Sequence, residues 1–198
     1  MKTLKNLKNY LLILLIGVVV GGISIFFMTR EKSEPEITQT SIQEQLQSSA
    51  ELITTKYFYT KIGKFENSLE MNGWTIPLTN KFFILTFEGE ADLGVDLSKV
   101  EVDVKENNIH IQLPKVEILN NTIDENSIEI YDESKNIFNP ISVDDYKKFA
   151  VSQKKVIEKE IEEKNVYKKA EENTKQIIRS ILNKDSNIHN NYEIDIQF

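Results

Sequence analysis

The residue types that most often carry chemistry are sparse in this 198-residue chain. It has no cysteine, which excludes disulfides, thiol nucleophiles, iron–sulfur clusters and cysteine-ligated zinc. Its two histidines, His110 and His189, are too few for a His-rich metal site. No Ser, Cys or carboxylate relay is visible in the sequence around His110, and His189 lies in an Asn-rich stretch. Neither histidine is therefore expected to be a catalytic base.

Carboxylates are frequent between residues 92 and 133, and paired carboxylates can hydrolyse glycosides or bind a divalent ion. Glu101 and Asp103 alternate with valines, as on the wet face of a strand. None of the acids has EF-hand spacing, and phosphate-loop, nucleophile-elbow and zinc-protease motifs are absent. We expect a solvated surface without metal or cofactor. The acids are Asp92, Asp96, Glu101, Asp103, Asp124, Glu125, Glu129, Asp132 and Glu133.

The single tryptophan, Trp74, lies in the stretch FENSLEMNGWTIPLTNKFF. Asn72-Gly73 predicts a turn, and 74–78 predicts a short edge strand. The favoured interpretation is a core aromatic at a β corner, packed with Phe65 and Pro77. The alternative is an exposed ligand platform or a membrane-interface anchor. Trp74 is therefore the one candidate ligand or interaction residue.

The elements around these residues follow from hydrophobic periodicity. Two period-2 runs from Val100 to Leu113 flank an Asn-rich turn, which predicts an antiparallel hairpin. Residues rich in Thr, Tyr, Phe and Ile predict the other strands. These strands are expected at 51–65, at 81–97 with a bend at Gly89 or Gly94, and as two short strands at 115–119 and 127–131 around the polar NNTIDEN.

After Pro140 the apolar residues step by three and four, which predicts a helix from about 144 to 183 with a break near Asn165. Its thin apolar stripe suits packing on a sheet or on another helix. The last segment, NYEIDIQF, alternates again and predicts a terminal strand that needs a sheet.

The 18 uncharged residues at 11–28, LLILLIGVVVGGISIFFM, are just long enough to cross a bilayer. A cleaved signal peptide is the rival, but its apolar run is shorter and ends in small residues. Lys2, Lys5 and Lys8 precede the run, which favours a cytoplasmic N-terminus. Gly17 and Gly21 have the spacing that permits close helix approach.

Beyond residue 28 the chain holds 31 acidic and 21 basic residues, a net charge of −10. No basic cluster interleaves with aromatics, so nucleic-acid binding is excluded. The predicted organisation is an α+β fold preceded by a transmembrane helix, with a mostly antiparallel β domain, a long amphipathic helix and a terminal strand. Its parts are a basic cytoplasmic tail (1–9), an anchor (10–28), a linker or stalk helical near its end (29–50), a β-rich domain (51–140), a long helix (141–184), and a loop with the terminal strand packed on the β domain (185–198).

Two segments carry a family resemblance. They are GEADLGVDLSKV, with Gly89, Gly94 and Asp96, and LPKVEIL followed by TID, with Leu113, Pro114 and Asp124. With the neighbouring segments they resemble the domain-of-unknown-function 4230 family over about residues 50–198. The resemblance implies a short bacterial protein with an N-terminal membrane segment. It assigns no activity, and no catalytic residue is carried over.

These observations favour a single-pass membrane protein with an extracytoplasmic, non-enzymatic interaction or scaffold domain. The expected partners are the bilayer, through residues 10–28, and a second copy or another membrane protein, through the helix stripe or the glycines of the anchor. The alternative is an extracytoplasmic ligand-binding module or hydrolase, with Trp74 and carboxylates in a cleft.

Overall fold

The computed structural model describes residues 37–198, which form one compact unit. This unit is α+β, with mostly antiparallel sheets and its longer helices in the C-terminal half, as predicted. No helix within 37–198 has the length and hydropathy of a membrane span. The predicted anchor at 10–28 lies outside the described residues.

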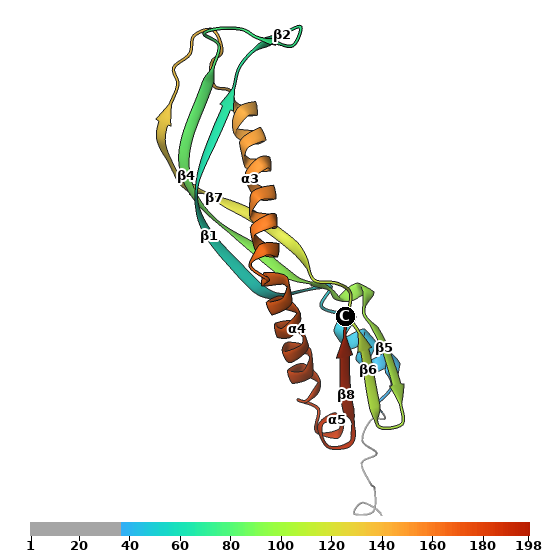
Figure 1. Cartoon of the computed structure of the whole chain (residues 1–198). Helices are drawn as coiled ribbons and strands as arrows, with labels where there is room; N and C mark the ends of the chain where they lie inside the picture. The colour runs from blue at the N-terminus through green and yellow to red at the C-terminus, as the bar shows by residue number, and fades with distance from the viewer. Residues whose placement is uncertain (1–36) are drawn as a thin grey trace, which may run out of the picture. The chain divides into compact units, whose positions relative to one another are not determined.

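The elements alternate between long strands, short hairpins and helices (Figure 1). The helices are α2 (Gln39–Gln47), the 3-10 turn η1 (Leu97–Lys99), α3 (Val143–Glu163), α4 (Val166–Leu182) and α5 (Ser186–Asn191). The strands are β1 (Glu51–Asn67), β2 (Glu70–Met71), β3 (Trp74–Thr75), β4 (Lys81–Asp96), β5 (Glu101–Lys105), β6 (Asn108–Gln112), β7 (Glu117–Glu133) and β8 (Glu193–Gln197).

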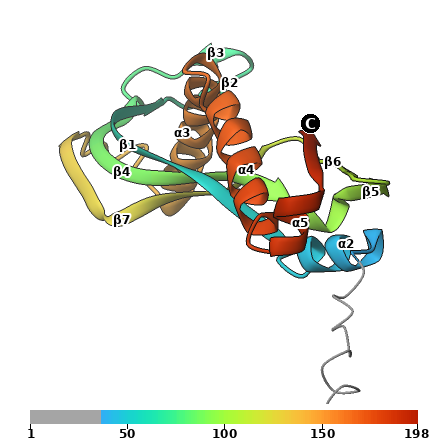
Figure 2. The ribbon, with the colours of Figure 1, turned by 90° about the horizontal axis from the view of Figure 1, so that it is seen from below.

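The largest sheet is antiparallel with the order β1-β4-β7, so β4 lies at its centre. Phe83, Leu85 and Phe87 alternate along β4 and are buried, because α3 and α4 pack on one face of this sheet (Figure 2). The ring of Tyr59 lies directly over Gly89, where any side chain would overlap it. The glycine therefore permits this close approach between β1 and β4.

The predicted long helix is two helices, and the break falls at Asn165. This residue has a left-handed φ of 56°, which asparagine tolerates better than most residues. The apolar stripe of both helices, including Ile157, Ile161 and Ile178, is buried against the chain's own sheet. These three buried residues are thus not available as a contact surface for another chain.

The two short strands predicted around NNTIDEN are in fact one strand, β7. Its register steps from Thr86↔Glu129 to Glu88↔Asp124, so residues 125–128 form a bulge opposite a short stretch of β4. A polar run is tolerated because β7 is an edge strand with both faces largely exposed. The polar run NNTIDEN therefore leads into a bulge within one strand and does not separate two strands.

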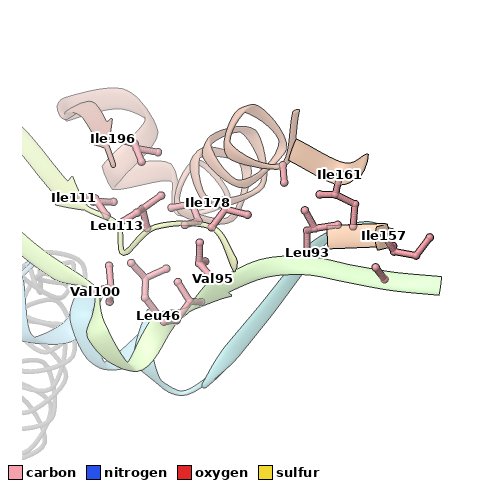
Figure 3. Packing of buried hydrophobic residues seen from close by; sticks show 14 of the residues in the cluster. Leu46, Leu93, Val95, Val100, Ile111, Leu113, Ile157, Ile161, Ile178 and Ile196 are labelled. Atoms are coloured by element: carbon pink, nitrogen blue, oxygen red, sulfur yellow. The ribbon is translucent and has the colours of Figure 1, made fainter. Parts of the chain in front are cut away.

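The second sheet has the order β5-β6-β8. The predicted hairpin is confirmed as β5 and β6, and the predicted terminal strand is confirmed as β8, which pairs parallel to β6. Buried residues of this sheet, including Ile111 and Ile196, join the same core as β4 and the helices (Figure 3).

Two further helices lie outside the predicted long helix: the helix expected near the end of the linker, and one within the predicted loop. Within the predicted linker, α2 packs on β5 and buries Ile42 and Leu46. Its start is capped by the Thr38 side chain, which accepts a hydrogen bond from the Ser41 amide. Within the predicted loop, 186–191 form α5.

Candidate functional site

Trp74 is 81% exposed, so the interpretation as a core residue was wrong. It lies in the two-residue strand β3, opposite Met71 of β2, and the predicted turn at Asn72-Gly73 joins the two strands with positive φ angles of 53° and 80°. Phe65, its expected neighbour, instead stacks on Phe83 with ring centroids 5.1 Å apart. The hairpin is too short to reach back over the core.

The β2–β3 hairpin, which holds Trp74, lies at one end of the β1-β4-β7 sheet (Figure 1). We call this end the tip; it comprises 68–80, between β1 and β4, and 134–142, between β7 and α3. Its five most exposed large apolar side chains, the tip patch, are Met71 (65%), Trp74 (81%), Leu78 (83%), Ile137 (83%) and Phe138 (66%). Sequence reasoning found only Trp74, because the two segments are distant in the chain.

Side-chain amides hold the two segments of the tip together. Asn136 donates from Nδ2 to the carbonyl oxygens of Leu78 (3.0 Å) and Asn80 (2.8 Å), and its Oδ1 accepts from the Phe138 amide (2.9 Å). The buried Asn139 donates from Nδ2 to the carbonyl oxygen of Thr79 (2.8 Å). Backbone groups that a loop would otherwise leave unpaired are thus bonded by side chains, which fixes the tip without apolar burial.

A buried ion pair fastens the tip to the first turn of α3. Lys81 Nζ lies 2.7 Å from Asp145 Oδ2, with only 9% and 5% of the side chains exposed, and it also donates to the Pro140 carbonyl oxygen (3.3 Å). Asp145 accepts from the Ser142 amide (2.7 Å) and hydroxyl (2.9 Å) as a helix cap. Burial acts to raise the pKa of Asp145, but Lys81 and Ser142 outweigh it and lower that pKa.

Leu78 has an unusual backbone for its type, with a φ of 63°. A left-handed conformation costs a residue with a side chain about 1–2 kcal/mol. The side chain of Leu78 is 83% exposed, so burial within the described fold does not offset that cost. Leu78 lies in a turn directly after Pro77, and its strained backbone and exposed apolar side chain make it a candidate contact residue of the tip.

The two histidines lie in different elements, His110 in β6 and His189 in α5. Nδ1 of His110 lies 2.9 Å from Oδ2 of Asp195, across the β6–β8 pairing. This partner could not be predicted from the sequence, since parallel pairing with a strand 85 residues away leaves no local pattern. Both side chains are exposed, and no hydroxyl nucleophile of 37–198 is bonded to the ring.

The carboxylates are dispersed over the strands. Asp92 is buried beside Lys56 (3.2 Å), and Lys99 and Ser98 lower the pKa of Asp96 to about 2. The residues of 37–198 contain no group of three acids or histidines placed to hold a metal ion. One hollow, of about 870 Å³, has Glu88, Glu90, Asp124 and Glu125 in its lining and does not include Trp74. The structure therefore separates the tryptophan from the acids of this hollow.

Searches of curated proteins and of solved structures each found no match. A family model described as a protein of unknown function, DUF4230, matches residues 44–193. The matched range begins in α2 and runs into β8, and so takes in both larger sheets, the tip and helices α3 to α5. The chain therefore belongs to the DUF4230 family of proteins of unknown function.

Proposed function

We propose that this protein is a membrane-anchored, extracytoplasmic interaction module, without catalytic activity, whose tip patch binds a partner protein. The anchor is the apolar segment at 10–28, and its orientation follows from Lys2, Lys5 and Lys8. The single observation that carries the proposal is the tip patch, five large apolar side chains exposed on a hydrogen-bonded support.

The support distinguishes the tip from a loose loop. A rigid surface loses little conformational entropy on binding, and this favours affinity. The patch holds Trp74 and Phe138, and aromatic residues are enriched at the energetic centres of interfaces. The strand β1 spans 17 residues, or about 55 Å at 3.3 Å per residue, and so carries the tip well away from α2.

Charge favours a protein over an anionic lipid surface as the partner. Residues 37–198 contain 28 acidic and 19 basic residues, a net charge of −9. Near the patch, Asp132 and Glu133 end β7 and Glu70 lies in β2. An anionic membrane would repel these carboxylates, whereas a protein with an apolar surface and a basic margin would complement them.

The alternative, a hydrolase or ligand-binding cleft built from Trp74 and carboxylates, is less favoured. Such a site needs a concave pocket that holds both. Neither the 870 Å³ hollow nor a second hollow of about 610 Å³ is lined by Trp74, and the acids of the first lie in the middle of the sheet rather than at the tip.

Site-specific photo-crosslinking in native membranes tests the proposal. A photoreactive phenylalanine analogue is placed in the full chain at Trp74 or Phe138, and at Phe58 as a control. Phe58 is 69% exposed against 66% for Phe138, but it lies in the middle of β1, outside the tip. We expect both tip positions to capture the same protein, and Phe58 not to capture it.

Co-purification gives a second readout without a crosslinker. The double substitution W74A/F138A removes two exposed aromatic side chains, so it should reduce recovery of that protein at least tenfold while leaving the unfolding midpoint almost unchanged. Equal recovery with wild type and variant, or equal crosslinking at Phe58 and Phe138, would contradict the proposal.

A further inference from the structure

A second feature, independent of the tip, lies between α3 and β7. It is an open groove of about 610 Å³ on the helix-covered face of the β1-β4-β7 sheet. Its apolar lining comes from the sheet and from α3, and Val143 lies at the N-terminal end of the part of α3 that lines it. The other apolar residues are Leu85, Phe87, Ile123, Ile128, Tyr146, Phe149 and Ala150. We call it the α3–β7 groove.

The groove lies where α3 approaches the edge strand β7. The helix α4 packs on β1 and β4, whereas α3 packs on β1 and more lightly on β7. The bulge at 125–128 adds to the lining, since Ile128 belongs to the groove although its strand is at the edge of the sheet. Leu85, Phe87 and Phe149 form the buried floor of the groove, and the accessible apolar side chains stand along its two sides, on β7 and α3.

The rim of the groove carries unneutralised positive charge. Lys147 and Lys154 follow Val143 on the groove side of α3, with Ala150 between them. Lys148, on the same helix but outside the groove, is ion-paired with Asp144 (2.7 Å). In the described part of the chain neither groove lysine forms such a pair. One carboxylate, Glu125 of β7, also lines the groove, so its local charge is two ammonium groups against one carboxylate. A positive balance beside apolar side chains, in a domain of net negative charge, favours an anion joined to an apolar body.

The shape of the groove selects a linear apolar body. The part of α3 that lines the groove, from Val143 to Lys154, is about 16 Å long at 1.5 Å per residue. This length is comparable to that of an extended long alkyl chain. An extended peptide fits less well. Strand addition needs a continuous ladder along β7, and the bulge at 125–128 interrupts it beside the groove.

We propose that the α3–β7 groove binds a long-chain fatty acid, with the alkyl chain on the apolar strip and the carboxylate at Lys147 or Lys154. Each methylene of the alkyl chain that leaves water for the apolar strip adds to the affinity. The lysines then determine which head group is accepted. This site does not depend on the tip, so each of the two proposals can be tested independently of the other.

Photolabelling of the full chain in native membranes tests this site. The probe is palmitic acid with a diazirine in its chain, and labelled peptides are located by mass spectrometry. We expect label on peptides from 122–128 and 143–154. Probes with the same chain but an alcohol or an amine head should label these peptides progressively less, because only the carboxylate pairs with the lysines.

Matched substitutions on α3 separate groove occupancy from general lipid contact. Ala150 lines the groove, whereas its neighbour Val151 is 52% exposed and lies outside it. A150F should fill the groove and abolish labelling of these peptides, while V151F should label like wild type. The double variant K147E/K154E should reduce labelling about fivefold or more, and K155E, which changes an exposed lysine outside the groove, should not.

Three results would overturn the proposal. They are equal labelling of A150F and V151F when both unfold at the wild-type temperature, equal or stronger labelling by the amine probe, and a peptide rather than the fatty acid recovered in the groove. Crosslinking from Trp74 should be unaffected by A150F, so failure of the groove leaves the tip proposal in place.

Discussion

Two short hairpins within 37–198, β2–β3 and β5–β6, have similar local sequences but differ in burial. Both turn through residues with positive φ, Asn72-Gly73 in one and Glu106 in the other. In the β5–β6 hairpin, Ile109 and Ile111 are fully buried, because α2 packs on β5 and α4 packs on β8 of the same sheet. In the β2–β3 hairpin, Met71 and Trp74 stay exposed because no element covers them. Burial is decided by what covers a strand, not by the strand alone.

The two regions are therefore stabilised differently. The β5–β6 end is held by apolar contacts, whereas the tip is held by amide hydrogen bonds and by the Lys81–Asp145 pair. We call Asn136, Asn139 and the Lys81–Asp145 pair the polar frame of the tip. Substitutions in this frame should lower the stability of the fold, whereas substitutions in the tip patch should not. At the other hairpin the apolar residues should be the sensitive ones.

The largest effect is expected at the polar frame. D145A leaves Lys81 buried without its partner and removes the cap of α3, so the free energy of unfolding should fall by about 3–5 kcal/mol. Denaturant unfolding measures it. The neighbouring D144A removes an exposed pair with Lys148 and should cost less than about 1 kcal/mol. Similar losses in the two variants would mean that the buried pair does not hold the tip.

The next effect distinguishes the two hairpins directly. I111A opens a cavity at a residue with 0% exposure and should lower the free energy of unfolding by about 3 kcal/mol. The same change at the tip, I137A, removes a side chain that is 83% exposed and should cost less than about 0.5 kcal/mol. If I137A cost as much as I111A, the tip patch would be structural rather than a free surface.

An intermediate effect is expected between the two ends, where α3 meets β1. Glu160 pairs with Lys164 and Lys61 and accepts from the Tyr57 hydroxyl (3.0 Å), and these partners lower its pKa from 4.5 to about 2. A depressed folded-state pKa means that the stabilisation is complete above pH 4.5 and is lost as the pH falls toward 2.

The substitution E160Q should therefore cost about 1–2 kcal/mol at pH 7, and its difference from wild type should shrink between pH 4.5 and pH 2. Other carboxylates titrate in the same window, so the informative quantity is this difference, measured by denaturant unfolding at several pH values. E158Q, at an exposed position of the same helix, serves as the control. A difference that does not change with pH would rule out Glu160 as an acid-labile contact.

Local patterns predicted those parts of the fold that local forces determine. The Val100–Leu113 hairpin shows its alternation in the sequence, and an asparagine tolerant of positive φ indicated the break at Asn165. What depends on distant partners was not visible. The burial of α2 requires β5 to lie beneath it, and the His110–Asp195 contact requires β8 to pair with β6.

Trp74 illustrates the limit most clearly. A lone tryptophan between strands is usually buried, and that general rule gave the wrong answer. Its exposure depends on Asn136 and Asn139, which reach from the β7–α3 connection and fix 78–80 by hydrogen bonds. Polar side chains support this loop, so the tryptophan is not needed to plug it. These hydrogen bonds leave no sign in the sequence, because Asn136 and Asn139 are distant in the chain from 78–80 and meet them only in the folded protein.

The smallest effect on stability is expected for L78G, which tests whether a residue of the tip patch serves binding rather than folding. L78G relieves the left-handed strain at φ 63°, but it also increases the freedom of the unfolded chain, and these terms nearly cancel. The free energy of unfolding should therefore change by less than about 0.5 kcal/mol, whereas recovery of the tip's partner should fall. L78N tolerates the same backbone without the added freedom, so it should unfold at a slightly higher temperature than L78G. A loss above about 1 kcal/mol in L78G would show that Leu78 supports the fold, and the strained backbone would then have a structural reason rather than a functional one.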